Sequence, residues 1–130
     1  MVFLNLASGC TQSHKPSYPG NFVYLGANQV TSEMKRMSEY MRQIDEILLD
    51  NSTISSEQQT QLVRILVAID DTANRLGAGG VKTNHLIIDD HIDQFKRDVN
   101  TALRNAAADP PNYFALGKLS GSCIACHVYR

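Results

Sequence analysis

Residues 30–48 read VTSEMKRMSEYMRQIDEIL, and an apolar side chain recurs there at every third or fourth position. The recurring residues are Val30, Met34, Met37, Met41, Ile44 and Leu48. Side chains at this spacing lie along one face of an α-helix, because the helix turns once in about 3.6 residues. The stretch therefore predicts an amphipathic helix from residue 29 to about residue 50, capped at its start by Thr31 or Ser32.

The next segment, residues 55–76, repeats the helical spacing. Ser56 and Gln59 stand at the spacing of a capping box, in which each side chain bonds the backbone of the other. The apolar face consists of Leu62, Ile65, Leu66, Ile69, Ala73 and Leu76. Glycines at positions 77, 79 and 80 follow, and glycine accepts the left-handed backbone conformation that ends helices. We expect a second helix that stops at Gly77.

Two more helices are predicted in the remaining third of the chain. A third helix begins near Thr83 and ends before Asp109-Pro110-Pro111, because a residue that precedes proline is pushed out of the helical region. Its apolar face consists of Ile88, Ile92, Phe95, Val99 and Leu103. A fourth runs from Pro111 or Asn112 to Arg130. No segment alternates apolar and polar residues over strand length, so we predict no sheet and an all-α fold, an antiparallel four-helix bundle over residues 29–130.

Composition narrows the class of protein. The 130 residues suit one domain, and 12 basic against 13 acidic residues give a net charge of −1, without the basic excess that nucleic-acid binding needs. No apolar run approaches the roughly 18 residues of a membrane-spanning helix. The acidic pairs Asp70-Asp71 and Asp89-Asp90 are expected on solvated faces.

The first 28 residues differ from the rest. An apolar stretch turns to small residues and then to Cys10, which resembles the end of a bacterial lipoprotein signal, although no Lys or Arg precedes it. In such signals the cysteine becomes lipidated. We therefore interpret residues 1–28 as a truncated lipoprotein signal followed by a tether, with Cys10 as a membrane anchor. An ordinary N-terminal strip is the alternative.

The residues that carry chemistry are Cys123-Ile124-Ala125-Cys126-His127, a C-x-x-C-H haem-attachment motif. Positions i, i+3 and i+4 share one face of a helix. Cys123 and Cys126 can therefore form thioethers with two neighbouring vinyl groups of one porphyrin, while His127 binds the iron as its proximal ligand. The motif predicts one covalently bound haem c near the C-terminal helix.

Three other roles of this motif are alternatives to haem attachment. A dithiol redox pair of the thioredoxin type expects a strand–helix–strand setting, which the sequence does not offer. A zinc site needs four protein ligands, and Cys10 lies far from the other two cysteines in the sequence. A disulfide between Cys123 and Cys126 would close a very small loop and stabilise little. We favour haem c over all three.

A C-x-x-C-H motif on the last of four helices, close to the chain end, resembles the cytochrome c′ family. The resemblance covers residues 29–130. It implies a haem beside the last helix, redox partner proteins and, by analogy, a homodimer. Members of the family close with His, two residues, an aromatic residue and Arg, whereas this chain closes with His127-Val128-Tyr129-Arg130, one residue shorter. The resemblance therefore implies an Arg130 contact near the haem, shifted in angle.

The other side of the iron decides the function. In one branch of the family a methionine of the first helix binds the iron on its distal side. When the family's first helix is aligned with this chain, that distal residue corresponds to Met34. We predict Met34 as the distal ligand and Met37 and Met41 as core residues. One departure is Val30, where the family commonly has Arg. Ligation of the iron by His85 or His91 is an alternative, but we favour the interpretation that both are surface histidines.

These residues together predict one-electron transfer by a haem with His127 and Met34 as its axial ligands, without enzyme activity. Because thioether attachment in bacteria takes place outside the cytoplasm, we expect a periplasmic protein or one anchored to a membrane and facing the periplasm. The first alternative is a five-coordinate haem protein that binds small gases such as NO or CO. The second is an interaction module whose cysteines never receive haem.

Overall fold

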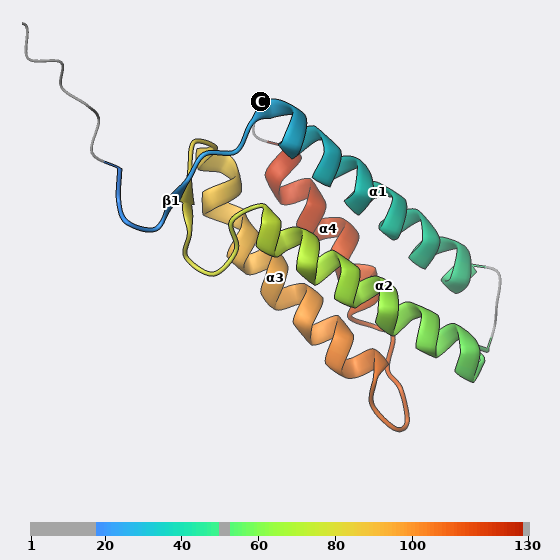
Figure 1. The fold of residues 1–130 in the computed structure, drawn as a ribbon. Coiled ribbons are helices and arrows are strands. Elements are labelled where there is room, and N and C mark those ends of the chain that lie inside the picture. The colour runs from blue at the N-terminus through green and yellow to red at the C-terminus, as the bar shows by residue number, and fades with distance from the viewer. Residues whose placement is uncertain (1–17, 50–52, 129–130) are drawn as a thin grey trace, which may run out of the picture.

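The computed structural model describes residues 18–49 and 53–128, and four helices make up most of this part of the chain (Figure 1). The helices are α1 (Ala27–Leu49), α2 (Ser56–Arg75), α3 (Leu86–Ala106) and α4 (Leu116–His127). Helix α1 packs on α2, α2 on α3, and α3 on α4. The prediction of four helices that pack against one another is confirmed. The prediction of no sheet is wrong, because two short strands pair with each other. Cys10 and Arg130 lie outside the described residues.

The core lies where the predicted apolar faces meet. Every residue of the predicted face of α2 is buried, and Leu62, Leu66 and Ile69 are fully enclosed. On α3 the predicted residues Ile88, Ile92, Phe95 and Val99 are buried too. Burial of such a side chain is worth about 1.5–3 kcal/mol, so the two apolar faces supply much of the folding free energy.

The helix starts differ from the predicted ones. Helix α1 begins at Ala27, so Thr31 and Ser32 lie inside it and the predicted caps are wrong. The capping box of α2 exists one residue earlier than predicted: the Ser55 hydroxyl accepts from the Gln58 backbone at 3.2 Å, and the Ser55 backbone donates to the Gln58 side chain at 2.8 Å. A shift of one residue is possible because serine stands at both 55 and 56.

Helix α4 begins later than predicted, at Leu116 rather than at Pro111 or Asn112. The residues before it form turns instead. The Phe114 backbone N–H donates to Asn112 Oδ1 at 2.9 Å, and the Leu116 N–H donates to the Tyr113 carbonyl at 3.0 Å. An asparagine side chain that bonds the backbone two residues on competes with helix formation, which explains the delay.

A two-stranded sheet, which the sequence analysis did not predict, joins the N-terminal segment to the bundle. Strand β1 (Phe22–Val23) pairs in parallel with β2 (Lys82–Thr83), in the loop between α2 and α3. Strands of two residues are too short to show alternation. Beside them the Leu25 N–H donates to Asn84 Oδ1 at 2.7 Å, and Leu25 itself is 1% exposed, so the Leu25 side chain belongs to the core.

The loop that contains β2 depends on the glycines at the end of α2. Gly77 has a φ of +100°, and a Cβ there would lie 2.8 Å from Thr83 Cγ2. The predicted role of these glycines in ending the helix is therefore confirmed. Asp89 closes the other side of the loop, because its carboxylate accepts hydrogen bonds from the Thr83 N–H and hydroxyl. We predicted Asp89 on a solvated face, and this prediction is wrong.

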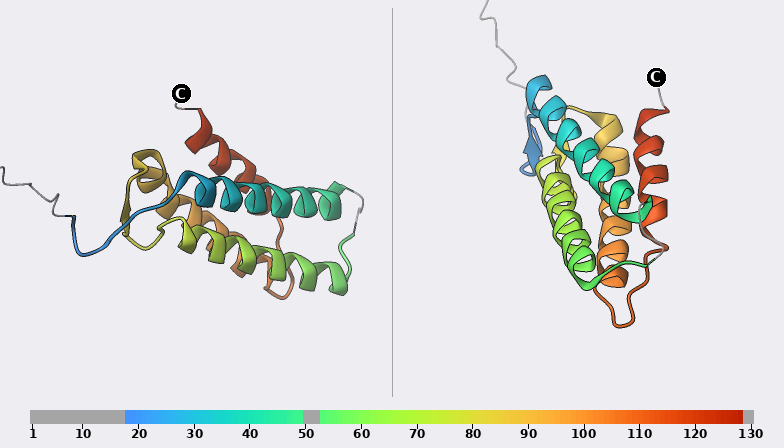
Figure 2. Two further views of the ribbon diagram at one scale, coloured as in Figure 1. Left: turned by 45° about the horizontal axis from the view of Figure 1, so that its top comes forward. Right: turned by 90° about the vertical axis from the view of Figure 1, so that its right-hand side faces the viewer.

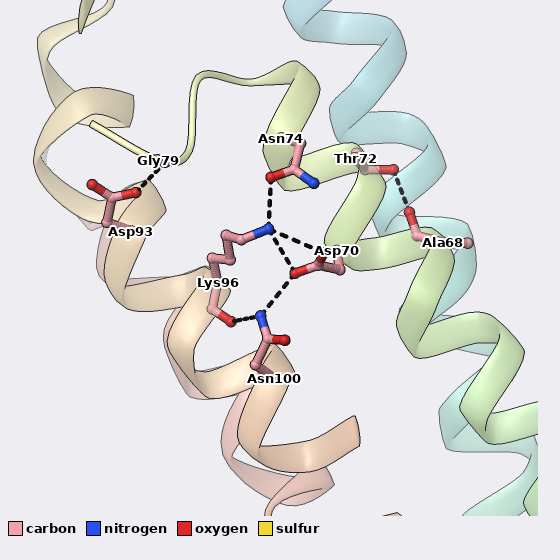
Figure 3. A network of polar contacts seen from close by, with 8 residues as sticks. All are labelled: Ala68, Asp70, Thr72, Asn74, Gly79, Asp93, Lys96 and Asn100. Carbon is pink, nitrogen blue, oxygen red and sulfur yellow. Dashed lines mark hydrogen bonds and ion pairs between the residues drawn. The ribbon is translucent and has the colours of Figure 1, made fainter. Parts of the chain in front are cut away.

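Polar side chains close the contact between α2 and α3 (Figure 3). Lys96 Nζ lies 3.0 Å from the Asp70 carboxylate and donates to Asn74 Oδ1 at 2.6 Å. Asn100 donates to Asp70 at 2.8 Å. Asp70 was predicted to be solvated, and this is wrong because Lys96 of α3 reaches it from the facing helix.

Several segments meet at one end of the bundle. The last turn of α4 lies at the end where α1 begins, and β1 lies at that end too (Figures 1 and 2). No helix among the described residues is both long and apolar enough to span a lipid bilayer.

Candidate functional site

A cavity of about 470 Å³ has α1 and α4 as two of its walls. This volume falls within the 300–1,000 Å³ that is typical of small-molecule and cofactor sites. Residues at the end of α2 and on α3 complete the lining. The lining residues are Met34, Met37, Ser38, Met41, Leu76, Ile92, Phe95, Ser120, Ser122, Cys123, Ile124, Cys126 and His127.

The wall on α4 contains all three chemical groups of the C-x-x-C-H motif. Cys123, Cys126 and His127 line the cavity from successive turns of the helix. The two thiols are free and half-buried, and the imidazole is exposed. One helix therefore presents two sulfurs and one ring nitrogen to the same space.

The cysteine thiols are shielded from water. Burial raises the pKa of Cys126, and burial together with the nearby Cys126 raises the pKa of Cys123. This shift favours the neutral thiol form of both cysteines. Dithiol oxidoreductases depend on a lowered thiol pKa, so the electrostatics of this site do not favour the dithiol alternative.

Packing and one hydrogen bond hold α4 in place. Leu116 and Leu119 are buried against the core, and the Ser122 hydroxyl donates to Asp98 Oδ2 of α3 at 2.6 Å. Gly117 and Gly121 weaken the helix by about 1 kcal/mol each, and a Cβ at either would meet nothing within 4 Å. Contacts with α3 thus offset a low intrinsic helix propensity next to the motif.

The wall on α1 presents three thioethers. Met34, Met37 and Met41 all line the cavity, and Met37 is the most deeply buried, at 7% exposed. Met34 and Met41 are half-buried and pack against the core. The structure therefore brings Met34 to the same cavity as the C-x-x-C-H motif, together with the two methionines that we predicted as core residues.

The other histidines lie elsewhere. His85 is half-buried, and its ring Nε2 lies 3.0 Å from the Leu25 carbonyl oxygen beside β1. Neither His85 nor His91 is among the residues that line the cavity. Among residues 18–49 and 53–128, no group of three or more His, Cys, Asp and Glu side chains gathers as a metal site would require.

Part of the lining was not predicted from the sequence. Ser38 lies four residues after Met34, so the helical period could have placed it on the same face. Leu76 and Phe95 were assigned only to the core, because an apolar stripe does not distinguish a packed side chain from one that borders a cavity. Of the described residues in the lining, none is Asp, Glu, Lys or Arg.

Comparisons with protein-family models, with curated proteins and with solved structures gave no match to this chain.

Proposed function

We propose that this chain is a monohaem c-type cytochrome of the cytochrome c′ type, an antiparallel four-helix bundle that transfers one electron. Cys123 and Cys126 hold the haem through thioethers, and His127 is the proximal ligand of the iron. The observation that carries the proposal is the cavity between α1 and α4. It is lined on one side by the C-x-x-C-H motif and on the other by methionines.

The residues of the cavity fit a haem in their chemistry. The two thiols and the imidazole share one wall, and the rest of the lining is apolar except for Ser38, Ser120 and Ser122. An apolar lining suits the flat, largely apolar face of a porphyrin. It also surrounds the proposed iron ligands with apolar side chains on the protein side, and burial of this kind is one of the ways in which proteins set a reduction potential.

In this proposal Met34 is the distal ligand. Met34 lines the cavity from α1, and His127 lines the same cavity from α4. When bound, the haem supplies a one-electron couple between ferric and ferrous iron, and a soft thioether favours the ferrous state. Leu76, Ile92 and Phe95 exclude water from the other side of the cavity. The residues bind and tune the couple and act on no substrate, so we propose an electron carrier with redox partner proteins, not an enzyme.

Gas binding is the second candidate function, and one observation favours it. Three methionines line the cavity together, so α1 offers an apolar distal wall whether or not one of them binds iron. A five-coordinate haem behind such a wall would bind NO or CO.

The remaining parts of the proposal concern residues outside the described chain. We propose that the protein is exported, that Cys10 is lipidated and holds it at a membrane facing the periplasm, and that Arg130 lies near the haem. A homodimer is proposed by analogy with the family alone.

The first experiment tests whether haem is attached. The chain is produced with an export signal in a bacterium that matures c-type cytochromes, and the pyridine haemochrome and the haem stain of a denaturing gel are measured. We expect one haem per chain that survives denaturation. The double variant Cys123→Ala/Cys126→Ala should lose it while circular dichroism still shows a helical protein.

A colourless wild-type protein contradicts the proposal. It would favour the alternative of an interaction module whose cysteines never receive haem. If haem is present, the ferric spectrum separates the two haem functions. A methionine–iron charge-transfer band supports electron transfer, whereas high-spin ferric iron that takes up NO, with CO binding after reduction, supports gas binding.

A further inference from the structure

Glu33 is a buried acidic residue on α1. It is 7% exposed, and its Oε2 lies 3.1 Å from Arg75 Nη2 at the end of α2. Arg36 of the same helix lies farther away, with Nη1 3.8 Å from Glu33 Oε1. Within the described residues Glu33 Oε2 accepts no hydrogen bond of good geometry, so the charge of Arg75 is its compensation.

Arg75 is held in turn by α2. Its Nη2 donates to the Thr72 hydroxyl at 2.9 Å, and Thr72 is fully buried and donates to the Ala68 carbonyl at 2.8 Å. The Glu33 carboxylate raises the pKa of Arg75. The ion pair therefore connects α1 to a side chain that is itself fixed on α2.

The neighbours of the two residues line the cavity. Met34 follows Glu33 on α1, and Leu76 follows Arg75 at the end of α2. Within the described chain this is the one ion pair that joins α1 to α2. This ion pair between the two helices is thus directly beside the proposed iron ligand in the sequence.

Apolar packing alone would fix α1 less sharply. Met37, Ile44 and Ile47 bury their side chains against the core, but such burial is non-directional. A slip of α1 by one residue along its axis is about 1.5 Å and rotates each side chain by about 100°. The Glu33 side chain is 9% exposed and that of Arg75 is 41% exposed, so the pair is buried on the Glu33 side only. A buried ion pair gives little net stability, and its best-attested role is to specify register.

We infer that the Glu33–Arg75 ion pair sets the position of α1 and thereby holds Met34 where it can bind the iron. The inference rests on the proposed function and names Glu33 as a positioning residue for the distal ligand. It acts through Met34 and does not line the cavity itself.

The test uses the haem-loaded protein and the variants Glu33→Gln, Arg75→Gln, the double variant with both changes, and Arg75→Lys. Glu39→Gln is the matched control, because Glu39 forms an exposed ion pair with Arg42 on the same helix. The methionine–iron band of the ferric state, the rate of CO binding to the ferrous state and the urea midpoint are measured for each.

We expect Glu33→Gln and Arg75→Gln to lose most of the band and to bind CO faster, while Glu39→Gln keeps the wild-type band. Arg75→Lys, which keeps the charge, should retain it. The double variant leaves no buried charge without a partner, so its urea midpoint should recover towards wild type while its band stays weak.

A normal band in Glu33→Gln overturns the inference. So does a double variant that recovers both its stability and its band, since the pair would then be only structural. A wild-type protein with haem but without the band, or with a band that Met34→Ala leaves unchanged, overturns the inference while haem attachment stands. A colourless wild-type protein instead shows that the proposed function has failed.

Discussion

The contact between α2 and α3 and the space between α1 and α4 are built in opposite ways. Between α2 and α3 the apolar faces are buried except for Leu103, and Asp70, Lys96 and Asn100 close the contact with one ion pair and hydrogen bonds. Between α1 and α4 there is instead a cavity of about 470 Å³ lined by sulfur-containing and apolar side chains. The bundle's own side chains therefore fill the space between α2 and α3, but they do not fill the space between α1 and α4.

The difference separates stability from function. Helix α2 buries its whole apolar stripe, and α3 buries every residue of its stripe except Leu103, which is partly buried. Helix α1 packs on α2, and α4 packs on α3. The sides of α1 and α4 that line the cavity are not filled by these contacts. A group bound between them would therefore occupy space that the α1–α2 and α3–α4 contacts leave open.

The largest effect should come from the filled side. Ile69 is fully buried, so Ile69→Ala is expected to lower the free energy of unfolding by about 2–5 kcal/mol. Met41→Ala is the matched change on the cavity wall, and it should lose roughly half as much or less, because its surroundings are already partly open. Urea unfolding followed by circular dichroism measures both. Equal losses would contradict the distinction between the two sides.

The next effect concerns the polar contact of α2 and α3. Asp70→Ala leaves the ammonium of Lys96 without its carboxylate, in a half-buried position. We expect a loss of about 1–3 kcal/mol in the free energy of unfolding. Asp71→Ala, the neighbouring exposed position, should change it by less than about 0.5 kcal/mol. If the two variants unfold at the same urea concentration, the ion pair does not stabilise this contact.

On the open side the main effect should be spectroscopic. Met34→Ala is expected to replace a methionine–iron band with the spectrum of high-spin ferric iron, at a cost below about 2 kcal/mol in unfolding because Met34 is only half-buried. The ferric optical spectrum and CO binding check this. Met37→Ala and Met41→Ala serve as controls, and the band should persist in both. Loss of the band in one of them alone would identify that methionine as the ligand.

The smallest effect is a pH dependence on the exposed face of α1. Hydrogen bonds from Arg42 and Gln43 lower the pKa of Glu39 from 4.5 to about 2. A carboxyl whose folded pKa is depressed stabilises the fold above its unfolded pKa, and this stabilisation is lost as the pH falls. Wild type should therefore melt slightly higher than Glu39→Gln above pH 4.5, and the difference should vanish near pH 2. A difference that does not change with pH would contradict this.

The helices were largely predictable, because stripes of apolar residues at helical spacing report burial directly. All six residues of the α2 stripe are buried. The small sheet was not predictable, because two-residue strands have no period and depend on contacts such as that between Leu25 and Asn84, which are 59 positions apart. The start of α4 was missed because side-chain bonding by Asn112 is a local competition that a stripe does not reveal.

For the candidate site, the sequence predicted the residues with distinctive chemistry. Cys123, Cys126, His127 and Met34 all line one cavity. Glu33 could not be singled out, because an acidic residue in an amphipathic helix usually faces water. Only the approach of Arg75 from another helix explains why it is buried.

The strap formed by residues 21–25 has a mechanical consequence. Its backbone is bonded to the α2–α3 loop: the Asn21 side chain donates to the Gly80 carbonyl at 2.8 Å, and the Asn21 carbonyl accepts from the Lys82 N–H at 3.1 Å. A pull from upstream along the chain would therefore be transmitted first to this loop and to α3, and only afterwards to α1. Met34 would be insulated from such a load, so tension on the N-terminal side need not disturb the wall of the cavity.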